Sequence, residues 1–189
     1  LTGVVNRVRF NEHLAKVVER ANAIGAGVAL LSFDLDRFKE INDVHGHAAG
    51  DLVLQTVAQR ASSALGVREF LARMGGDEFC GLIENYYARN DAVDFARRLQ
   101  KEITQPIDWQ GHRLSVGVSF GISVLSPEMR GVDELFTQAD VAMYRAKAGA
   151  SGTICFYDKR MDEAVIERNA LATAMRAGLS RGEFELHFQ

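Results

Sequence analysis

The 189-residue chain contains only two cysteines, Cys80 and Cys155. Both lie in apolar, strand-like runs, and neither has a partner at metal-site spacing. We therefore expect buried free thiols rather than metal ligands or a disulfide. Free thiols fit a reducing compartment, so a cytoplasmic location is expected.

The sequence also lacks a run of eighteen apolar residues and a signal peptide. Direct membrane contact by this chain is therefore not expected. The chain opens on Leu1 and has no starting methionine, so we expect a piece of a longer protein. Any membrane anchor would lie upstream of it.

An excess of basic residues is absent as well, because the formal net charge is −3. Nucleic-acid binding proteins neutralise phosphates with clustered Lys and Arg, so nucleic acid is not an expected partner. Apolar residues make up 47% and charged residues 25% of the chain, as in soluble globular domains. The length is sufficient for one domain with a real core.

Hydrophobic periodicity predicts an alternation of helices and short strands. The expected helices cover residues 10–21, 51–64, 90–105 and 135–147, and the expected strands cover 28–33, 70–74, 79–83, 114–120 and 154–157. A polar loop is expected at 42–50. This order mixes crossovers with one hairpin, so it predicts an α+β fold with helices packed on a mostly antiparallel sheet. A doubly wound parallel sheet fits less well.

Acidic residues gather at two of these elements. Asp34 and Asp36 end the first buried strand, and Asp77 and Glu78 occupy the tip of the hairpin that Gly75-Gly76 turns. Carboxylates at the end of a buried strand are costly unless a cation meets them. Oxygen ligands from two segments suit Mg²⁺, which completes its shell with waters and substrate phosphates.

Cationic and amide groups nearby suggest a nucleotide. Lys39, with the backbone amides of Arg37 and Phe38, and Lys147 on the last long helix are candidate phosphate contacts. Asn42 and Asp51 have the donors and acceptors that a guanine edge needs. Metal and triphosphate together point to phosphoryl or nucleotidyl transfer, with a hairpin acid available to take the hydroxyl proton.

Each residue alone also has a simpler interpretation. Asp36 is better explained as a helix N-cap than as a metal ligand. Gly75-Gly76 alone would be an ordinary turn, and Lys39 alone a surface lysine. His47 is as consistent with a hydrogen-bonded loop residue as with a ligand contact. The combination of these residues favours a site.

The segment from Gly75 to Phe79 reads GGDEF, and with the preceding Ala72-Arg73-Met74 it resembles the signature hairpin of GGDEF diguanylate cyclases. Four further segments resemble motifs of that family in the same order. They are residues 1–7, 33–39, 41–51 and 139–147. The resemblance runs in register over residues 1–158.

The resemblance implies a nucleotide-cyclase and polymerase-palm-like fold with a ferredoxin-like core. It also implies a homodimer in which two facing domains each hold one GTP, with two Mg²⁺ or Mn²⁺ ions per GTP site. By position, the implied metal ligands are Asp34, the Leu35 carbonyl, Asp77 and Glu78. Asp77 and Glu78 are also the implied catalytic residues, with Asp77 as the acid or base. The implied substrate contacts are Arg37, Phe38, Lys39, Asn42, His47, Asp51, Gly75, Gly76 and Lys147.

The chain departs from the family pattern at two places. The RxxD product-inhibition motif normally ends six positions before the first signature glycine, where this chain has Gly66 and Glu69. Product feedback through that site is therefore not expected. An arginine that supports phosphates normally follows Lys147 by four residues, where this chain has Ser151. Loss of one cationic contact would weaken GTP binding by about 1.5 to 3 kcal/mol.

The tail resembles the beginning of an EAL phosphodiesterase domain. We expect a connecting helix at 159–182 and the truncated first strand of that domain at 183–189, which makes a downstream EAL domain the expected partner in the parent chain. The favoured function is synthesis of cyclic di-GMP from two GTP in bacterial signalling. The alternative is a weak or inactive GTP-binding module that regulates the neighbouring phosphodiesterase.

Overall fold

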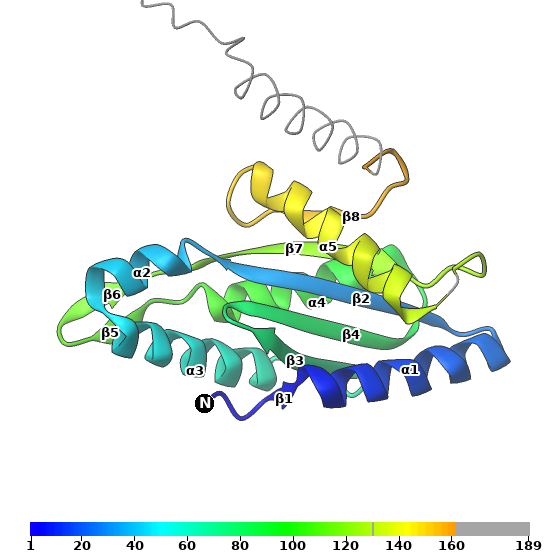
Figure 1. Ribbon diagram of the computed structural model, residues 1–189, viewed down its shortest axis with the longest axis horizontal. Helices are drawn as coiled ribbons and strands as arrows, with labels where there is room; N and C mark the ends of the chain where they lie inside the picture. Colours follow the sequence, from blue (N-terminus) through cyan, green and yellow to red (C-terminus); the bar gives the residue numbers. More distant parts are fainter. Residues whose placement is uncertain (130, 162–189) are drawn as a thin grey trace, which may run out of the picture. The chain divides into compact units, whose positions relative to one another are not determined.

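The structure is a computed structural model that describes residues 1–129 and 131–161 (Figure 1). The chain divides into two units, Leu1–Tyr157 and Asp158–Gln189. Every labelled helix and strand lies in the first unit. The helix expected at 159–182 and the strand expected at 183–189 lie outside the described residues from position 162 onwards. Within the described part, no helix is both long enough and apolar enough to cross a bilayer.

A six-stranded sheet with the order β1-β3-β4-β2-β7-β8 forms the centre of the first unit. Its strands are β1 (Val5–Asn6), β2 (Gly27–Asp36), β3 (Glu69–Gly75), β4 (Glu78–Tyr86), β7 (Gly117–Val124) and β8 (Ile154–Phe156). The three central pairings are antiparallel, and the two edge strands pair in parallel with their neighbours. The prediction of an α+β fold with a mostly antiparallel sheet is confirmed.

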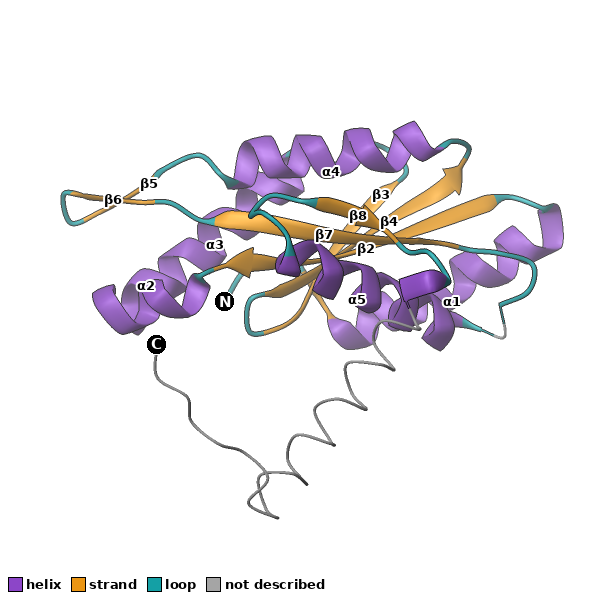
Figure 2. Ribbon diagram, turned by 90° about the horizontal axis from the view of Figure 1, so that it is seen from above, coloured by secondary structure: helices purple, strands orange, loops and turns teal. Residues whose placement is uncertain are grey.

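Within the described residues, five helices flank the sheet: α1 (Arg7–Ile24), α2 (Phe38–His45), α3 (His47–Ser63), α4 (Arg89–Ile103) and α5 (Val132–Ala148). The apolar sides of α3 and α4 pack in one core cluster, and those of α1 and α5 pack in a second. Figure 2 shows α4 and α5 on opposite sides of the sheet. The sheet therefore separates two hydrophobic layers.

Strand β2 is buried along almost its whole length, and its side chains alternate between the two layers. The odd-numbered residues Ala29, Leu31, Phe33 and Leu35 pack with α3 and α4, whereas Val28 and Leu30 pack with α1 and α5. Ser32 follows the even series and donates a hydrogen bond to Asp140 of α5 over 2.7 Å. The same alternation puts Asp34 on the α5 side of the sheet.

The segment predicted as a polar loop at 42–50 is helical. Helix α2 ends at His45, and α3 begins two residues later at His47. A Cβ atom on Gly50 would lie 2.0 Å from Oδ1 of Asn42, so only glycine permits this packing of α3 against α2. The polar composition suggested a loop, but Phe38 and Ile41 on α2 supply buried anchors.

A second small hairpin was not predicted. Strands β5 (Ile107–Trp109) and β6 (His112–Leu114) form a separate two-stranded sheet, which projects beside α2 in Figures 1 and 2. The strand expected at 114–120 is therefore two strands, β6 and β7, with a break before Gly117. Alternation of apolar residues continues across the break, which is why the pattern did not reveal it.

Both cysteines are free. Cys80 is buried in β4, and burial raises the pKa of its thiol well above the usual range. Cys155 in β8 is only half-buried. The prediction of free thiols is confirmed.

Candidate active site at the end of β2

Asp34 is the acidic residue that the fold buries most deeply at the end of β2, with 8% of its surface exposed. Register pairs it with Glu78 on one neighbouring strand and with Ser119 on the other. The strand β4 that carries Glu78 begins directly after the turn that contains Asp77. Strand pairing therefore brings Asp34 beside the two acids of the signature hairpin.

The cation beside Asp34 comes from α5. The Nζ atom of Lys147 lies 2.6 Å from Oδ1 of Asp34, at ion-pair distance. The ammonium is the donor that reaches this buried oxygen, and within the described residues no other donor is hydrogen-bonded to it. Lys147 occupies the penultimate position of α5, whose last turn thus delivers the ammonium to the carboxylate.

The electrostatics of Asp34 reflect this incomplete compensation. Burial raises its pKa to about 6, and repulsion by Asp77 and Glu78 acts in the same direction. The contact with Lys147 opposes the rise without cancelling it. Ionised Asp34 is therefore under-stabilised in the protein alone, because Lys147 offsets only part of the cost of burial and repulsion.

The second acid of the strand, Asp36, has a different role from the one predicted. Helix α2 has Arg37 as its N-cap, in the left-handed conformation with φ 60°, and no side chain caps it. The N-cap prediction for Asp36 is wrong. Its carboxylate instead accepts hydrogen bonds from Ser119 at 2.9 Å and from Ser151 at 2.5 Å.

Ser119 and Ser151 were not predicted as partners of Asp36. Ser119 lies on β7, and Ser151 lies in the connection between α5 and β8. Asp36 therefore ties three segments together at this end of the sheet. The alternation of small residues along 115–119 hinted at the β7 contact, whereas no local pattern marks Ser151.

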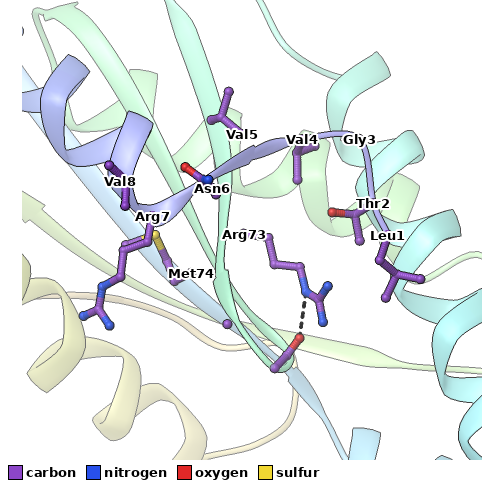
Figure 3. Close-up of a pocket in the computed structure, with 12 residues that line it drawn as sticks. Leu1, Thr2, Gly3, Val4, Val5, Asn6, Arg7, Val8, Arg73 and Met74 are labelled. Carbon is purple, nitrogen blue, oxygen red and sulfur yellow. Dashed lines mark hydrogen bonds between the residues drawn. The ribbon is translucent and has the colours of Figure 1, made fainter.

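The signature hairpin is closed by a side chain of its own first strand. Arg73 donates from Nε to the carbonyl oxygen of Gly76 over 2.8 Å (Figure 3). Gly76 has a φ of 50°, the left-handed conformation that glycine adopts without strain. Asp77 at the tip is half-buried and Glu78 is exposed. The glycine turn is confirmed, and it leaves both acids accessible.

A cleft of about 450 Å³ adjoins this hairpin. Residues 1–8 form one wall, and Arg73, Met74, Gly75 and Gly76 form the other (Figure 3). Neither Asp34 nor Lys147 lines it. The cleft therefore lies beside the acidic end of β2 and does not coincide with it.

The candidate base-binding residues lie on α2 and α3. The contact between Asn42 and Gly50 places the Asn42 amide against the first turn of α3, where His47 and Asp51 are exposed. This arrangement brings the three predicted side chains to one pair of packed helices.

The candidate phosphate loop begins where β2 ends. Arg37 and Lys39 are exposed, whereas the ring of Phe38 is buried in the core. Phe38 can therefore contribute only its backbone to a ligand. The same holds for Leu35, whose side chain is 1% exposed and belongs to the core.

The residues at this end of β2 fit a divalent metal as a partial ligand set. Asp34 offers a buried carboxylate, Leu35 offers its carbonyl, and the hairpin offers two accessible carboxylates. Across residues 1–129 and 131–161, no three His, Cys, Asp or Glu side chains already stand at metal-binding spacing. Such a set suits Mg²⁺, which takes few protein ligands and completes its shell with water and phosphate.

The positions of the product-inhibition motif are occupied by an internal contact. Glu69 accepts a hydrogen bond from the backbone N–H of Gly66 over 2.6 Å and forms an ion pair with Arg98 of α4. Its side chain is 12% exposed. Arg98 was not predicted, because it lies 29 residues away in sequence.

The chain matches a known protein family over most of its length. The family described as "Diguanylate cyclase, GGDEF domain" matches residues 1–152. The chain is similar to the bifunctional diguanylate cyclase/cyclic di-GMP phosphodiesterase MucR of Pseudomonas aeruginosa, with 36% identity over 191 residues, which is 100% of this chain and 27% of MucR. The chain spans about a quarter of the length of this relative.

Solved structures similar to this chain include domains of the same family. The GGDEF domain of TpbB from Pseudomonas aeruginosa is similar with a TM-score of 0.79 and 36% identity, over 84% of this chain and 99% of that one. The active GGEEF domain of a diguanylate cyclase from Vibrio cholerae has a TM-score of 0.76 and 27% identity, over 82% and 99%. With the match over residues 1–152 and the acidic end of β2, these likenesses show that the chain belongs to the GGDEF diguanylate cyclase domain family.

Proposed function

We propose that this chain binds GTP with divalent metal at the end of β2 and, as two facing copies, condenses two GTP into cyclic di-GMP and pyrophosphate. The observation that carries the proposal is the buried carboxylate of Asp34, which has the Lys147 ammonium as its charged partner and lies beside a hairpin that carries two further acids. A structural carboxylate would be satisfied by donors, as Asp36 is. Asp34 is arranged to receive a cation.

In this proposal the residues divide into three groups. Asp34, the Leu35 carbonyl and Asp77 hold metal with help from Glu78, while Asn42, His47 and Asp51 hold the guanine base and ribose. Lys39, Lys147 and the backbone of residues 37–38 and 75–76 contact the phosphates. The helices α2 and α3 thus hold one end of GTP and the strand end holds the other.

The proposed reaction is an in-line displacement at phosphorus. A ribose hydroxyl oxygen of each GTP attacks the α-phosphorus of the other, and at each phosphorus the bond to the bridging oxygen of the β-phosphate breaks. Two phosphodiester bonds form, and two pyrophosphates leave. Asp77, accessible at the hairpin tip, accepts the hydroxyl proton. Bound Mg²⁺ or Mn²⁺ ions, two per GTP site, would stabilise the negative charge on the attacking and leaving oxygens.

The proposed turnover needs a second copy of the chain, because one domain holds one GTP and the product contains two. In the parent protein, a downstream EAL domain is the proposed neighbour. Names of relatives such as MucR, a bifunctional cyclase and phosphodiesterase, support that arrangement.

The test is incubation of the purified chain with GTP and Mg²⁺ or Mn²⁺, with pyrophosphate and cyclic di-GMP as readouts. Asp77→Ala should abolish product. Asp94→Ala, the same change at an exposed position of α4, should leave the rate unchanged. Synthesis that persists at the wild-type rate in Asp77→Ala would contradict the assignment.

A second candidate function is regulation by GTP binding without turnover. Ser151 favours it, because the hydroxyl that replaces the family's arginine is hydrogen-bonded to Asp36 and offers no cation to phosphate. Tight binding of GTP without product, even at high protein concentration, would select this function over the cyclase.

A further inference from the structure

Lys147 is a proposed phosphate contact, yet in the structure its ammonium contacts Asp34, the candidate metal ligand. Nζ lies 2.6 Å from Oδ1 of Asp34, and the two side chains are 35% and 11% exposed. In the described ranges 1–129 and 131–161, Asp34 forms no other ion pair. Lys147 is thus the cation that the protein itself supplies to this carboxylate.

The surroundings of Asp34 explain why a cation is held there. Asp34 is buried, and Asp77 and Glu78 add negative charge. Three carboxylates without a positive charge nearby would repel one another, at low dielectric most strongly. Lys147 relieves part of that repulsion in the metal-free domain.

The same contact must compete with a metal. A divalent ion bound to Oδ1 of Asp34 would approach to about 2.0 to 2.1 Å for Mg²⁺, and the ammonium that lies 2.6 Å from the same oxygen would repel it. Lysine is suited to change partners, because its charge sits on a flexible four-carbon chain with rotatable donors. With 35% of the side chain exposed, the ammonium can leave Asp34 for a partner that binds at the surface.

We propose that Lys147 is an internal counter-ion that occupies Asp34 in the metal-free domain and transfers to the nucleotide phosphates when metal and nucleotide bind together. The phosphate half of this proposal rests on the proposed function, whereas the competition with metal does not. The consequence is that metal alone binds weakly, and that nucleotide helps metal to bind by drawing Lys147 away. Metal and nucleotide would therefore bind cooperatively.

The test is Lys147→Met, which keeps the length of the side chain and removes the charge. Binding of Mn²⁺ without nucleotide is measured from the loss of the free-ion electron paramagnetic resonance signal. We expect about tenfold tighter binding than in the wild type, because the competing charge is gone. Arg145→Met removes the same charge from an exposed position in the same helical turn and should change the Mn²⁺ affinity less than twofold.

Binding of a non-hydrolysable GTP analogue at saturating Mn²⁺ should change in the opposite direction. Lys147→Met loses a phosphate contact, so we expect at least tenfold weaker binding of the analogue. Lys147→Arg keeps the charge and should keep the weak Mn²⁺ affinity of the wild type. Thermal unfolding of each variant without metal checks that the domain is folded.

The two proposals fail in different ways. Mn²⁺ affinity in folded Lys147→Met that equals or falls below that of the wild type would overturn the counter-ion proposal. Absence of analogue binding by the wild type, together with tighter Mn²⁺ binding by Lys147→Met, would overturn the GTP assignment and support the competition with metal.

Discussion

Glu69 and Asp34 are two carboxylates of the sheet that each form an ion pair with a basic side chain of a helix. They differ in the hydrogen bonds that they accept in addition. Glu69 begins β3, pairs with Arg98 of α4 and also accepts the N–H of Gly66. Asp34 lies near the end of β2 and pairs with Lys147 of α5, but within the described residues its carboxylate accepts no hydrogen bond from a backbone N–H. Both acids are mostly buried, with side chains 12% and 11% exposed.

The difference separates a structural contact from an exchangeable one. Glu69 accepts both a charged side-chain donor, Arg98, and a backbone donor, the N–H of Gly66, so we expect these contacts to stabilise the folded chain. Asp34 faces one lysine and two like charges, and its raised pKa records that its charge opposes folding. The ion pair is favourable at both sites, but at Asp34 burial and repulsion by Asp77 and Glu78 outweigh it.

The largest expected effect is that of Asp34→Asn on activity. We expect product formation to fall at least a hundredfold, because the metal ligand is lost. The metal-free variant should at the same time be more stable than the wild type. We expect its free energy of unfolding at pH 7 to be about 1 to 3 kcal/mol higher, because a buried, repelled charge is removed. Urea denaturation and pyrophosphate release measure the two quantities. If Asp34→Asn were instead less stable than the wild type, the charge of Asp34 would favour folding, and Asp34 would not differ from Glu69 in this respect.

The pH dependence of stability gives the next largest effect. The pKa of Asp34 is about 6 in the folded state, against 3.8 for an unperturbed side chain. The folded state thus binds more protons between pH 4 and 6, and stability falls as the pH rises through this window, by at most about 3 kcal/mol. The measurement is the urea stability of metal-free wild type minus that of Asp34→Asn at each pH. A flat difference would contradict the prediction, and added Mg²⁺ should reduce the loss at neutral pH.

Glu69→Ala should have a smaller effect, of the opposite sign to that of Asp34→Asn. It removes the ion pair with Arg98 and leaves the Gly66 N–H without its acceptor, at a cost of about 2 kcal/mol of unfolding free energy. Glu69→Gln keeps an acceptor and should lose less. Cyclic di-GMP synthesis should be unchanged below the melting transition. A neutral Glu69→Ala would show that the contact does not stabilise the fold.

Ser151→Ala should have the smallest effect. It removes one of the two hydroxyl donors to Asp36, and we expect a loss of about 1 kcal/mol in unfolding free energy. Ser151→Thr keeps the hydroxyl and should restore it, whereas Ser115→Ala, at an exposed position in the segment that precedes β7, should be neutral. Equal stability of Ser151→Ala and the wild type would mean that Asp36 is held by Ser119 alone.

Hydrophobic periodicity sufficed for most of the fold. The helices α1, α3, α4 and α5 and the strands β2, β3, β4, β7 and β8 were each expected, with ends that differ by a few residues. It failed for α2, whose polar sequence resembles a loop and which is fixed by tertiary burial of Phe38. It also failed for β1 and for the β5–β6 hairpin, because two- and three-residue strands are too short to show a period.

The site was predicted in its residues but not in its contacts. Asp34 and Lys147 were expected to lie near the same ligand, whereas their direct pairing depends on how the end of α5 packs over β2. The error for Asp36 has the same origin. A carboxylate just before a helix suggests an N-cap. Arg37, in the left-handed conformation between Asp36 and α2, turns the chain, so Asp36 accepts hydrogen bonds from Ser119 and Ser151 instead. Partners 83 and 115 residues away leave no local signal.

Because side chains along β2 alternate between the two faces of the sheet, the site is sensitive to insertion or deletion of a single residue in this strand. Deletion of a single residue between Gly27 and Phe33 would invert the side chains that follow it, if pairing with β4 and β7 were kept. Asp34 would then point into the apolar layer formed by α3 and α4, away from Lys147. Selection for a folded core and selection for the acidic site therefore act on the same register, so indels in this strand should be eliminated even in lineages where catalysis is no longer needed.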